Sequence, residues 1–538
     1  MNAMRTALIL VIAWVLLPLS SCSTTLVPTP RLPKETRKQL PDDELLAALQ
    51  QDWAELQQVK MDNDLRQKLI ERYNANLLIF LRRLRYDILH DTGKKHKSFP
   101  SYLQVEHEGL RKPRRLNDVY DDIVPAADVK TYSLEEHYLL PGLGVPLVGV
   151  IPASKIRDGD HLPNLHARGT VSTLTALLEF PGDGRRIVLR LLPRHWHERV
   201  LVGRVSYPLA GDFSASMEIF WNLTNIKRGR FLGLLNPQKL RDTTGLTSIE
   251  RYNPDKIPVI LTHGLGSSAE TFNNLVNRLL SDREVRNNYQ FWYFNYATGI
   301  SWAVSAANFR EALRQARLQF DPHDKNNYWD KMVVVGHSRG GLITHLNQSE
   351  PTGNIPQDLP PELSPSDALM KELFEFQPIK VGQVVYMATP HRGAPIARNR
   401  LVLLLSNLVK LPKVLLTEAL SIATLQENTI LTNPRKLTRW FTSIAQLSPD
   451  SSDIRALALR PVQQVPTHSI IGDRGRHNSP RSSDGVVPYW SSHISWGTET
   501  IVPKNHHVHK APETAEDMKR VLKEHLARTK GERKAHSH

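Results

Sequence analysis

Apolar positions change their spacing from one part of the chain to the next. In the first third, leucines and aromatic residues recur at helical spacing on both sides of a polar break at 61–64, which predicts a helical hairpin over 42–95. Residues 96–250 have a different texture, with short β-prone runs between Pro, Gly and Asp turns, which predicts a β-rich accessory domain. The runs expected to be strands are Thr170–Phe180, Arg186–Leu192 and Phe213–Trp221.

Residues 251–530 alternate buried-type strands with helical segments. The closing helix is predicted to open at Pro512, because Met518, Val521, Leu522 and Leu526 repeat at helical spacing and would pack on a sheet. Residues 531–538 are predicted to be a disordered tail. The predicted strands of the sheet are Ile257–Thr262, Lys331–Val335, Val381–Met387, Val465–Gly472 and Thr498–Val502.

The amino terminus has the pattern of an export signal. A basic start precedes an apolar core at 7–17 that is too short to cross a bilayer comfortably. The segment Leu19–Cys22 resembles the lipobox of bacterial lipoproteins, which implies a signal peptide over 1–21, lipidation of Cys22 and a tether over 22–41. An ordinary cleaved signal peptide and an uncleaved anchor are the alternatives.

These features predict a lipid-anchored protein of the cell envelope. Ser23, in place of Asp, is the residue that sends such lipoproteins to the outer membrane if the source is a diderm bacterium. Cys22 is the only cysteine, so one thiol is present for an anchor and no disulfide can form within the chain.

The amino-acid composition indicates a folded, basic protein and little more. The chain of 538 residues is 40% hydrophobic and 23% charged, which is typical of folded proteins and long enough for two or more domains. Its net charge of +15 suits contact with anionic lipid or lipopolysaccharide. Nucleic acid is not an expected partner of an exported lipoprotein, and the oligomeric state is not predicted.

The strongest chemical signal is a Gly-x-Ser-x-Gly motif directly after a strand. Ser338 lies between Gly336 and Gly340, and a β-branched run precedes the motif. Such a strand–turn–helix exposes a strained serine at the carboxyl edge of a sheet, and larger residues at the two glycines would clash. We therefore interpret Ser338 as a nucleophile.

A nucleophilic serine needs a base and an acid, and the loops after the last two strands offer both. Asp484 follows the penultimate strand and His506 follows the last one, so both loops open on the same sheet edge as Ser338. Asp473 is the alternative acid, and His507 and His509 are the alternative bases.

Other histidines suggest weaker hypotheses. A metal site could be built from the His506 cluster with His493, although no second group at zinc spacing accompanies it. His391 is expected to form part of a site wall or to be structural.

Five segments in order resemble the α/β-hydrolase superfamily, in its lipase and esterase branch. They also resemble lecithin–cholesterol acyltransferase-like and GPI-inositol-deacylase-like lipases. The segments are His263–Gly266, Gly336–Gly341, Ala388–Gly393, Asp484–Pro488 and that around His506.

The resemblance implies an α/β-hydrolase fold: a mostly parallel central sheet flanked by helices. It implies that the N–H groups of Leu265 and Arg339 form an oxyanion hole and that the apolar segment at about 397–447 is a cap or lid. That segment would either open toward lipid or remain packed on the core.

The implied activity is serine carboxyl-ester hydrolysis through Ser338, His506 and Asp484 without a cofactor. The substrates would be acyl esters or phospholipids of the cell envelope. Acyl transfer by the same triad is one alternative, and a non-catalytic envelope lipoprotein with a hydrolase-like fold is another.

Overall fold

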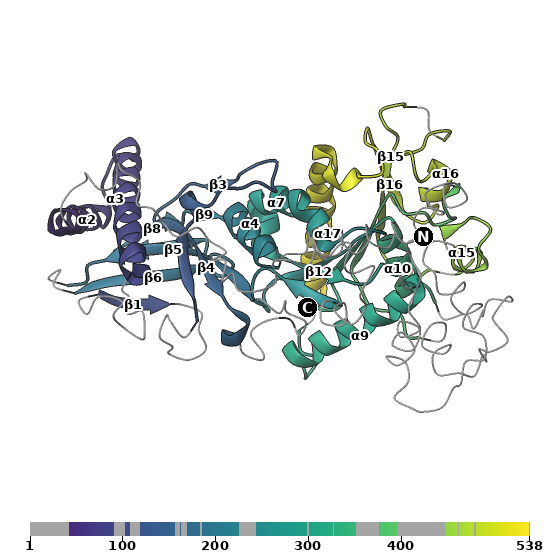
Figure 1. Cartoon of the computed structure of the whole chain (residues 1–538), viewed down its shortest axis with the longest axis horizontal. Coiled ribbons are helices and arrows are strands. Elements are labelled where there is room, and N and C mark those ends of the chain that lie inside the picture. Colours follow the sequence, from purple (N-terminus) through teal and green to yellow (C-terminus); the bar gives the residue numbers. More distant parts are fainter. Residues whose placement is uncertain are drawn as a thin grey trace, which may run out of the picture.

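The protein contains a five-stranded and a seven-stranded β-sheet, with helices on their faces (Figure 1). The computed structural model describes residues 42–90, 103–107, 119–156, 162, 169–182, 186–224, 244–298, 301–326, 328–350, 376–395, 447–460, 462–477 and 480–536. The signal segment, Cys22 and the tether lie outside these residues, and so does the predicted cap or lid apart from Leu447. Among the described residues, none of the helices has the length and apolarity needed to cross a membrane.

Two helices occupy the segment predicted to be a hairpin. Helix α2 (Asp42–Leu56) and helix α3 (Asn63–His90) are separated by a polar turn, in which Asp62 accepts a hydrogen bond from Asp64 N at 2.9 Å. Their apolar faces meet in one core cluster that includes buried Leu49 and Tyr73. The Tyr73 hydroxyl donates to Leu178 O of the five-stranded sheet at 2.8 Å, which joins the helices to that sheet.

The five-stranded sheet, called here the accessory sheet, has the order β1-β6-β5-β4-β2. Its only parallel pair is β1 with β6. The strands are β1 (Leu103–His107), β2 (Asp122–Pro125), β4 (Val145–Ile151), β5 (Thr170–Glu179) and β6 (Ile187–Pro193). Two ribbons accompany it, β3 (Leu139–Leu140) with β9 (Gly211–Asp212), and β7 (Arg199–Val202) with β8 (Val205–Pro208).

The prediction of a strand at 213–221 is wrong, because this segment forms helix α4 (Phe213–Thr224). Its apolar residues alternate with polar ones, yet every residue from 213 to 221 is buried. The polar side chains bond to neighbouring elements: Ser214 Oγ donates to Asn277 at 2.7 Å, and Glu218 accepts from Ser133 N at 3.0 Å. The alternation therefore reflects buried polar contacts and not the two faces of a strand.

The seven-stranded sheet has the order β10-β12-β11-β13-β14-β15-β16, and only the pair β10–β12 is antiparallel. This sheet confirms the predicted α/β fold. It starts at Gly245, ahead of the domain boundary predicted at 251. Its strands are β10 (Gly245–Ser248), β11 (Ile257–Thr262), β12 (Tyr289–Asn295), β13 (Val333–His337), β14 (Gln383–Met387), β15 (Thr467–Gly472) and β16 (Thr498–Val502).

Helices cover both faces of this sheet. Along β11, Val259 and Leu261 belong to one core cluster while Ile260 belongs to the other, as expected for a strand buried on both faces. Helices α7 (Asn273–Ser281), α8 (Arg283–Asn288) and α17 (Pro512–His536) contribute to the first cluster, and α9 (Trp302–Phe320) and α10 (Arg339–Gln348) to the second.

The last helix differs from prediction at its end. Met518, Val521, Leu522 and Leu526 of α17 are buried as expected. However, α17 continues to His536, so the prediction of a disordered tail is wrong for residues 531–536. Lys, Arg and Glu in this stretch are good helix formers, so a polar composition did not exclude a helix.

Short elements complete the chain. They are the helices α15 (Ser452–Ala458) and α16 (Tyr489–Ser492), and single turns of 3₁₀ helix at η3 (Ala126–Asp128), η4 (Ala153–Lys155), η5 (Ala269–Phe272) and η8 (Val508–Lys510). In Figure 1 the α2–α3 pair lies at one end of the molecule and α15 and α16 lie at the other.

Candidate active site

Ser338 occupies the sharp turn between β13 and α10. Its backbone angles are φ 54° and ψ −123°, a conformation that non-glycine residues rarely adopt and that costs about 1–3 kcal/mol. The surrounding sheet holds it there, because Ser338 N donates to Met387 O of β14 at 2.8 Å. Ser338 is only 8% exposed.

The two motif glycines let the strand and helix approach. A Cβ at Gly340 would lie 2.2 Å from Thr262 O of β11, and one at Gly336 would lie 2.5 Å from Gly341 Cα. Neither contact can be relieved by a side-chain rotation, because both involve backbone atoms. The glycines are thus required by close packing around Ser338.

Ser338, His506 and Asp484 form a continuous hydrogen-bonded chain. His506 Nε2 lies 2.9 Å from Ser338 Oγ, and His506 Nδ1 lies 2.8 Å from Asp484 Oδ2. With the carboxylate ionised, Nδ1 carries the proton and donates it, so Nε2 is left to accept from the serine hydroxyl.

Asp484 is held by its own loop. It is 2% exposed, and its Oδ1 accepts hydrogen bonds from Val486 N and Val487 N, both at 2.7 Å. Backbone donors therefore occupy one carboxylate oxygen and leave the other for His506. This fixes the orientation of the carboxylate without a second charged group.

Asp473, the alternative acid, has a different arrangement. Its Oδ1 accepts from Gly475 N at 2.7 Å and its Oδ2 accepts from His477 N at 2.9 Å. Both oxygens are used to shape the loop after β15, and none of the described contacts joins Asp473 to His506.

The alternative bases also point elsewhere. His509 is buried, and its Nε2 lies 2.8 Å from Thr271 Oγ1. Burial, and then the neighbouring His507, hold the pKa of the His509 ring well below its usual range. His507 is exposed, and partial desolvation of its ring lowers its pKa as well. Among the described contacts, neither ring bonds to Ser338 or Asp484.

His337 is a site residue that the sequence analysis missed. It directly precedes Ser338, and its Nε2 lies 2.8 Å from the backbone oxygen of His506. Burial, followed by the nearby His509 and His506, holds the pKa of His337 well below its usual range. The ring is therefore neutral with Nε2 protonated, and it donates to the backbone oxygen of His506.

The segments expected to supply the oxyanion hole lie beside Ser338. A Cβ at Gly264 would lie 3.0 Å from Ser338 Cβ, so the loop that continues into Leu265 passes directly next to Ser338. Arg339 follows Ser338 as the first residue of α10. Its fully buried guanidinium lies 5.0 Å from the centre of the Tyr296 ring, and burial lowers the pKa of Arg339.

The remaining predicted residues lie in other surroundings. His391 is buried and packs against His345, with 3.0 Å between the two Nδ1 atoms. His493 Nδ1 lies 2.8 Å from Glu499 and is not joined to His506 by any described contact. Within the described part of the chain, no three His, Cys, Asp or Glu side chains gather closely enough to hold a metal ion.

Comparisons with known proteins find similarity in solved structures alone: no family model and no curated protein matches the chain. A lipase of Staphylococcus hyicus shares 14% identity, covers 53% of this chain and 98% of its own, and has a TM-score of 0.32. Lipase BlEst2 of Bacillus licheniformis in mature form shares 15% identity over 49% of this chain and 92% of its own, with a TM-score of 0.30.

A third structure, lipase 1 of Pelosinus fermentans, shares 13% identity over 49% of this chain and 99% of its own, with a TM-score of 0.29. At such identities, similarity to these bacterial lipases concerns the fold and not the activity. The α/β fold itself rests on the strand order and pairing described above.

Proposed function

We propose that this protein is a serine hydrolase that cleaves carboxylic esters. The observation that supports the proposal is the chain of hydrogen bonds from Ser338 through His506 to Asp484. It combines a strained serine at the carboxyl edge of the sheet with a base at 2.9 Å and an acid that orients this base.

The proposed reaction proceeds through an acyl-enzyme. Ser338 Oγ attacks the ester carbonyl while His506 Nε2 takes its proton, and Asp484 stabilises the resulting imidazolium. The backbone N–H groups of Leu265 and Arg339 would bind the oxyanion, each contributing on the order of 3 kcal/mol. His506 then protonates the leaving alcohol, and water, activated by the same histidine, releases the acid and regenerates the serine.

The first prediction concerns the nucleophile. Ser338→Ala should lower ester turnover by about 10⁴-fold or more without unfolding the protein, because the hydroxyl is lost while Ala fits the same turn. Hydrolysis of p-nitrophenyl esters and labelling with a fluorophosphonate would measure this. Ser349→Ala, which removes another buried hydroxyl at the far end of α10, is the matched control and should keep its activity. Loss of activity in both variants, or in neither, would contradict the role of Ser338.

We propose acyl lipids of the cell envelope as substrates. The supporting features are in the sequence: the export signal, the net charge of +15 and the apolar segment at 397–447. Turnover of p-nitrophenyl esters should rise with acyl length and in the presence of micelles or phospholipid vesicles. Activity confined to short soluble esters would make the protein an esterase with no preference for lipid.

The proposed location is a membrane surface, with a lipid on Cys22. In a bacterial host, the wild-type protein should incorporate radiolabelled palmitate and sediment with membranes, whereas Cys22→Ala should do neither. A Ser23→Ala variant, which keeps the thiol, is the control. Labelling of the Cys22→Ala variant would exclude the proposed anchor.

A further inference from the structure

Helix α7 connects the loop that carries His506 with a loop from the first half of the chain. The second loop, called here the Glu135–Glu136 segment, lies between η3 and β3. Helix α7 contacts α4, α17 and η8, and Figure 1 shows it beside α4 and α17. Since η8 begins at Val508, two residues after His506, side chains of α7 are placed to reach both loops.

Two asparagines of α7 hold the Glu135–Glu136 segment by its backbone. Asn274 Oδ1 accepts from Glu135 N at 2.9 Å, and Asn277 Nδ2 donates to Glu136 O at 2.8 Å. Arg278 is on the same face of the helix, because residues three or four apart in a helix are neighbours. The backbone contacts therefore fix the segment where its two carboxylates can pair with Arg278.

The guanidinium of Arg278 contacts both loops at once. Its Nη2 lies 3.0 Å from Glu135 Oε2 and its Nε lies 3.2 Å from Glu136 Oε2. On the other side, Nη1 donates to Lys510 O of η8 at 3.2 Å. The planar fork of a guanidinium allows these contacts to be made together, which the single nitrogen of a lysine could not do.

The burial of these groups indicates what the contacts contribute. The Arg278 side chain is 8% exposed, whereas those of Glu135 and Glu136 are 52% and 43% exposed. Ion pairs with such exposed carboxylates add little stability. Their main effect is to fix the direction of a buried guanidinium, and this direction decides whether Nη1 reaches Lys510 O.

A short turn links Lys510 to His506. Lys510 N donates to His507 O at 3.0 Å, which closes the single turn of η8, and His507 directly follows His506. His337 Nε2 holds the same loop from another side, through its 2.8 Å contact with His506 O. The backbone that carries His506 is therefore supported on one side by β13 and on the other by Arg278.

We propose that Arg278 is a positioning residue, which holds the His506 loop in place from the Glu135–Glu136 segment. It acts through Lys510 O and the η8 turn, and it keeps His506 Nε2 opposite Ser338 Oγ. The inference rests on the proposed hydrolase function, because the placement of His506 affects catalysis only if this residue takes the serine proton. A displacement of about 1 Å at a catalytic group can cost on the order of 100-fold in rate.

Ester kinetics of two Arg278 variants test the proposal. Arg278→Met should lower kcat by about 10- to 100-fold and leave KM near the wild-type value, because the base moves while the substrate contacts remain. Arg278→Lys should not restore kcat, since one ammonium cannot reach the carboxylates and Lys510 O together. A wild-type kcat in either variant would overturn the proposal.

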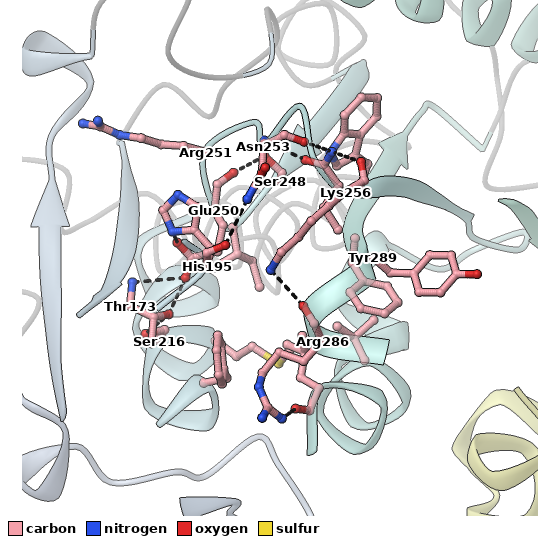
Figure 2. A pocket seen from close by; sticks show the side chains of 18 of the residues that line it. Thr173, His195, Ser216, Ser248, Glu250, Arg251, Asn253, Lys256, Arg286 and Tyr289 are labelled. Atoms are coloured by element: carbon pink, nitrogen blue, oxygen red, sulfur yellow. Dashed lines mark hydrogen bonds and ion pairs between the residues drawn. The ribbon is translucent and has the colours of Figure 1, made fainter. Parts of the chain in front are cut away.

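Arg286 of α8 offers a matched control. It is equally buried, pairs with Glu198 at 3.1 Å, and lines a cavity elsewhere between the accessory sheet and the seven-stranded sheet (Figure 2). None of its described contacts is with η8. Arg286→Met should therefore lower Tm as Arg278→Met does, because each loses a buried guanidinium, but it should keep its kcat. An equal loss of kcat in both variants would reflect general destabilisation and overturn the role of Arg278.

The contribution of the Glu135–Glu136 segment needs a separate variant. Glu135→Gln combined with Glu136→Gln should lower kcat, though less than Arg278→Met, because the guanidinium loses the partners that orient it. Glu106→Gln is the control, since it removes a half-exposed partner of Arg186 in the accessory sheet. A wild-type kcat in the double variant, or an equal loss in the control, would overturn the part assigned to this segment.

A spectroscopic measurement separates this proposal from the proposed function. The proton between His506 Nδ1 and Asp484 should give a low-field NMR signal, assigned by its absence from His506→Gln. It should shift or broaden in Arg278→Met but not in Arg286→Met, whether or not the wild type hydrolyses an ester. A wild type without esterase activity would contradict the proposed function alone. An unchanged signal in Arg278→Met would overturn the positioning role.

Discussion

Asp473 and Asp484 are both buried near the carboxyl end of β15, and their hydrogen bonds distinguish their roles. Asp473 uses both oxygens on backbone N–H groups, whereas Asp484 uses one and offers the other to His506. A carboxylate with one oxygen free and fixed in place is suited to hold an imidazole in a single tautomer.

This difference predicts opposite results for the same substitution. Asp484→Asn should lower kcat by about 10⁴-fold with little loss of stability, because the amide favours the wrong His506 tautomer. Asp473→Asn should retain kcat within a few-fold but lower the free energy of unfolding by about 1–3 kcal/mol, because an amide nitrogen would face a backbone donor. Ester kinetics and urea denaturation would measure both. A kcat loss confined to Asp473→Asn would assign the acid to that residue.

For single residues, the sequence shows the type of side chain but not the backbone groups with which it forms hydrogen bonds. The spacing of Ser338, Asp484 and His506 after successive strands is enough to expect them at one edge. The contact from His337 to the His506 carbonyl joins positions 169 residues apart in the chain and follows only from the packed structure. The same is true of the contact between His509 and Thr271.

The turn that carries Ser338 depends on close contact between β11 and α10. Gly340→Ala would place a Cβ 2.2 Å from Thr262 O, so the helix must move away from the strand or the protein must unfold. We expect a destabilisation of about 3 kcal/mol or more, together with loss of activity, as measured by thermal unfolding and ester hydrolysis.

The matched control is Gly531→Ala in α17. A Cβ there meets no atom within 4 Å, so the change should stabilise the helix by up to about 1 kcal/mol. If Gly340→Ala were as harmless as Gly531→Ala, the close packing around Ser338 would not be required for the fold.

Two strands of the seven-stranded sheet were predicted with the bounds that the structure has. Ile257–Thr262 and Thr498–Val502 match β11 and β16 residue for residue. Helix α4 shows the opposite case. Its polar residues Ser214, Ser216 and Glu218 alternate with apolar ones as in a strand, but they are buried and bond to residues distant in the sequence. Local pattern cannot identify such partners, because they lie in β5, in α7 and in the loop around Ser133.

At the scale of the whole molecule, five of the histidines that the structure describes are buried with lowered pKa values: His195, His337, His345, His391 and His509. Burial is the largest cause for each of them. In the unfolded chain these rings bind protons below about pH 6.5, but in the folded protein they remain neutral at that pH. The unfolded state therefore binds more protons, and stability falls as the pH drops below about 6.5.

The pair His345 and His391 allows a quantitative test. Burial lowers the pKa of His345 to about 3. The free energy of unfolding should therefore fall progressively from about pH 6.5 to about pH 3 because of this residue, by up to about 1.4 kcal/mol per pH unit. The free energy of unfolding, measured in urea between pH 7.5 and 5, should decline less steeply in His345→Gln than in the wild type. His323→Gln, at an exposed position, should leave the slope unchanged. An identical slope in all three proteins would exclude this role for the buried pair.

The hydrogen bond from Ser338 to His506 joins residues 168 positions apart in the chain. His506 follows β16, which is the last of the described strands and lies at an edge of the sheet. During synthesis the nucleophile, its turn and the strands around it emerge long before the base. On the proposed mechanism, a chain that ends before Thr498 has an inert serine, whatever else has folded. Hydrolytic activity would thus begin only after the final strand has docked, so an unfinished chain would not hydrolyse esters.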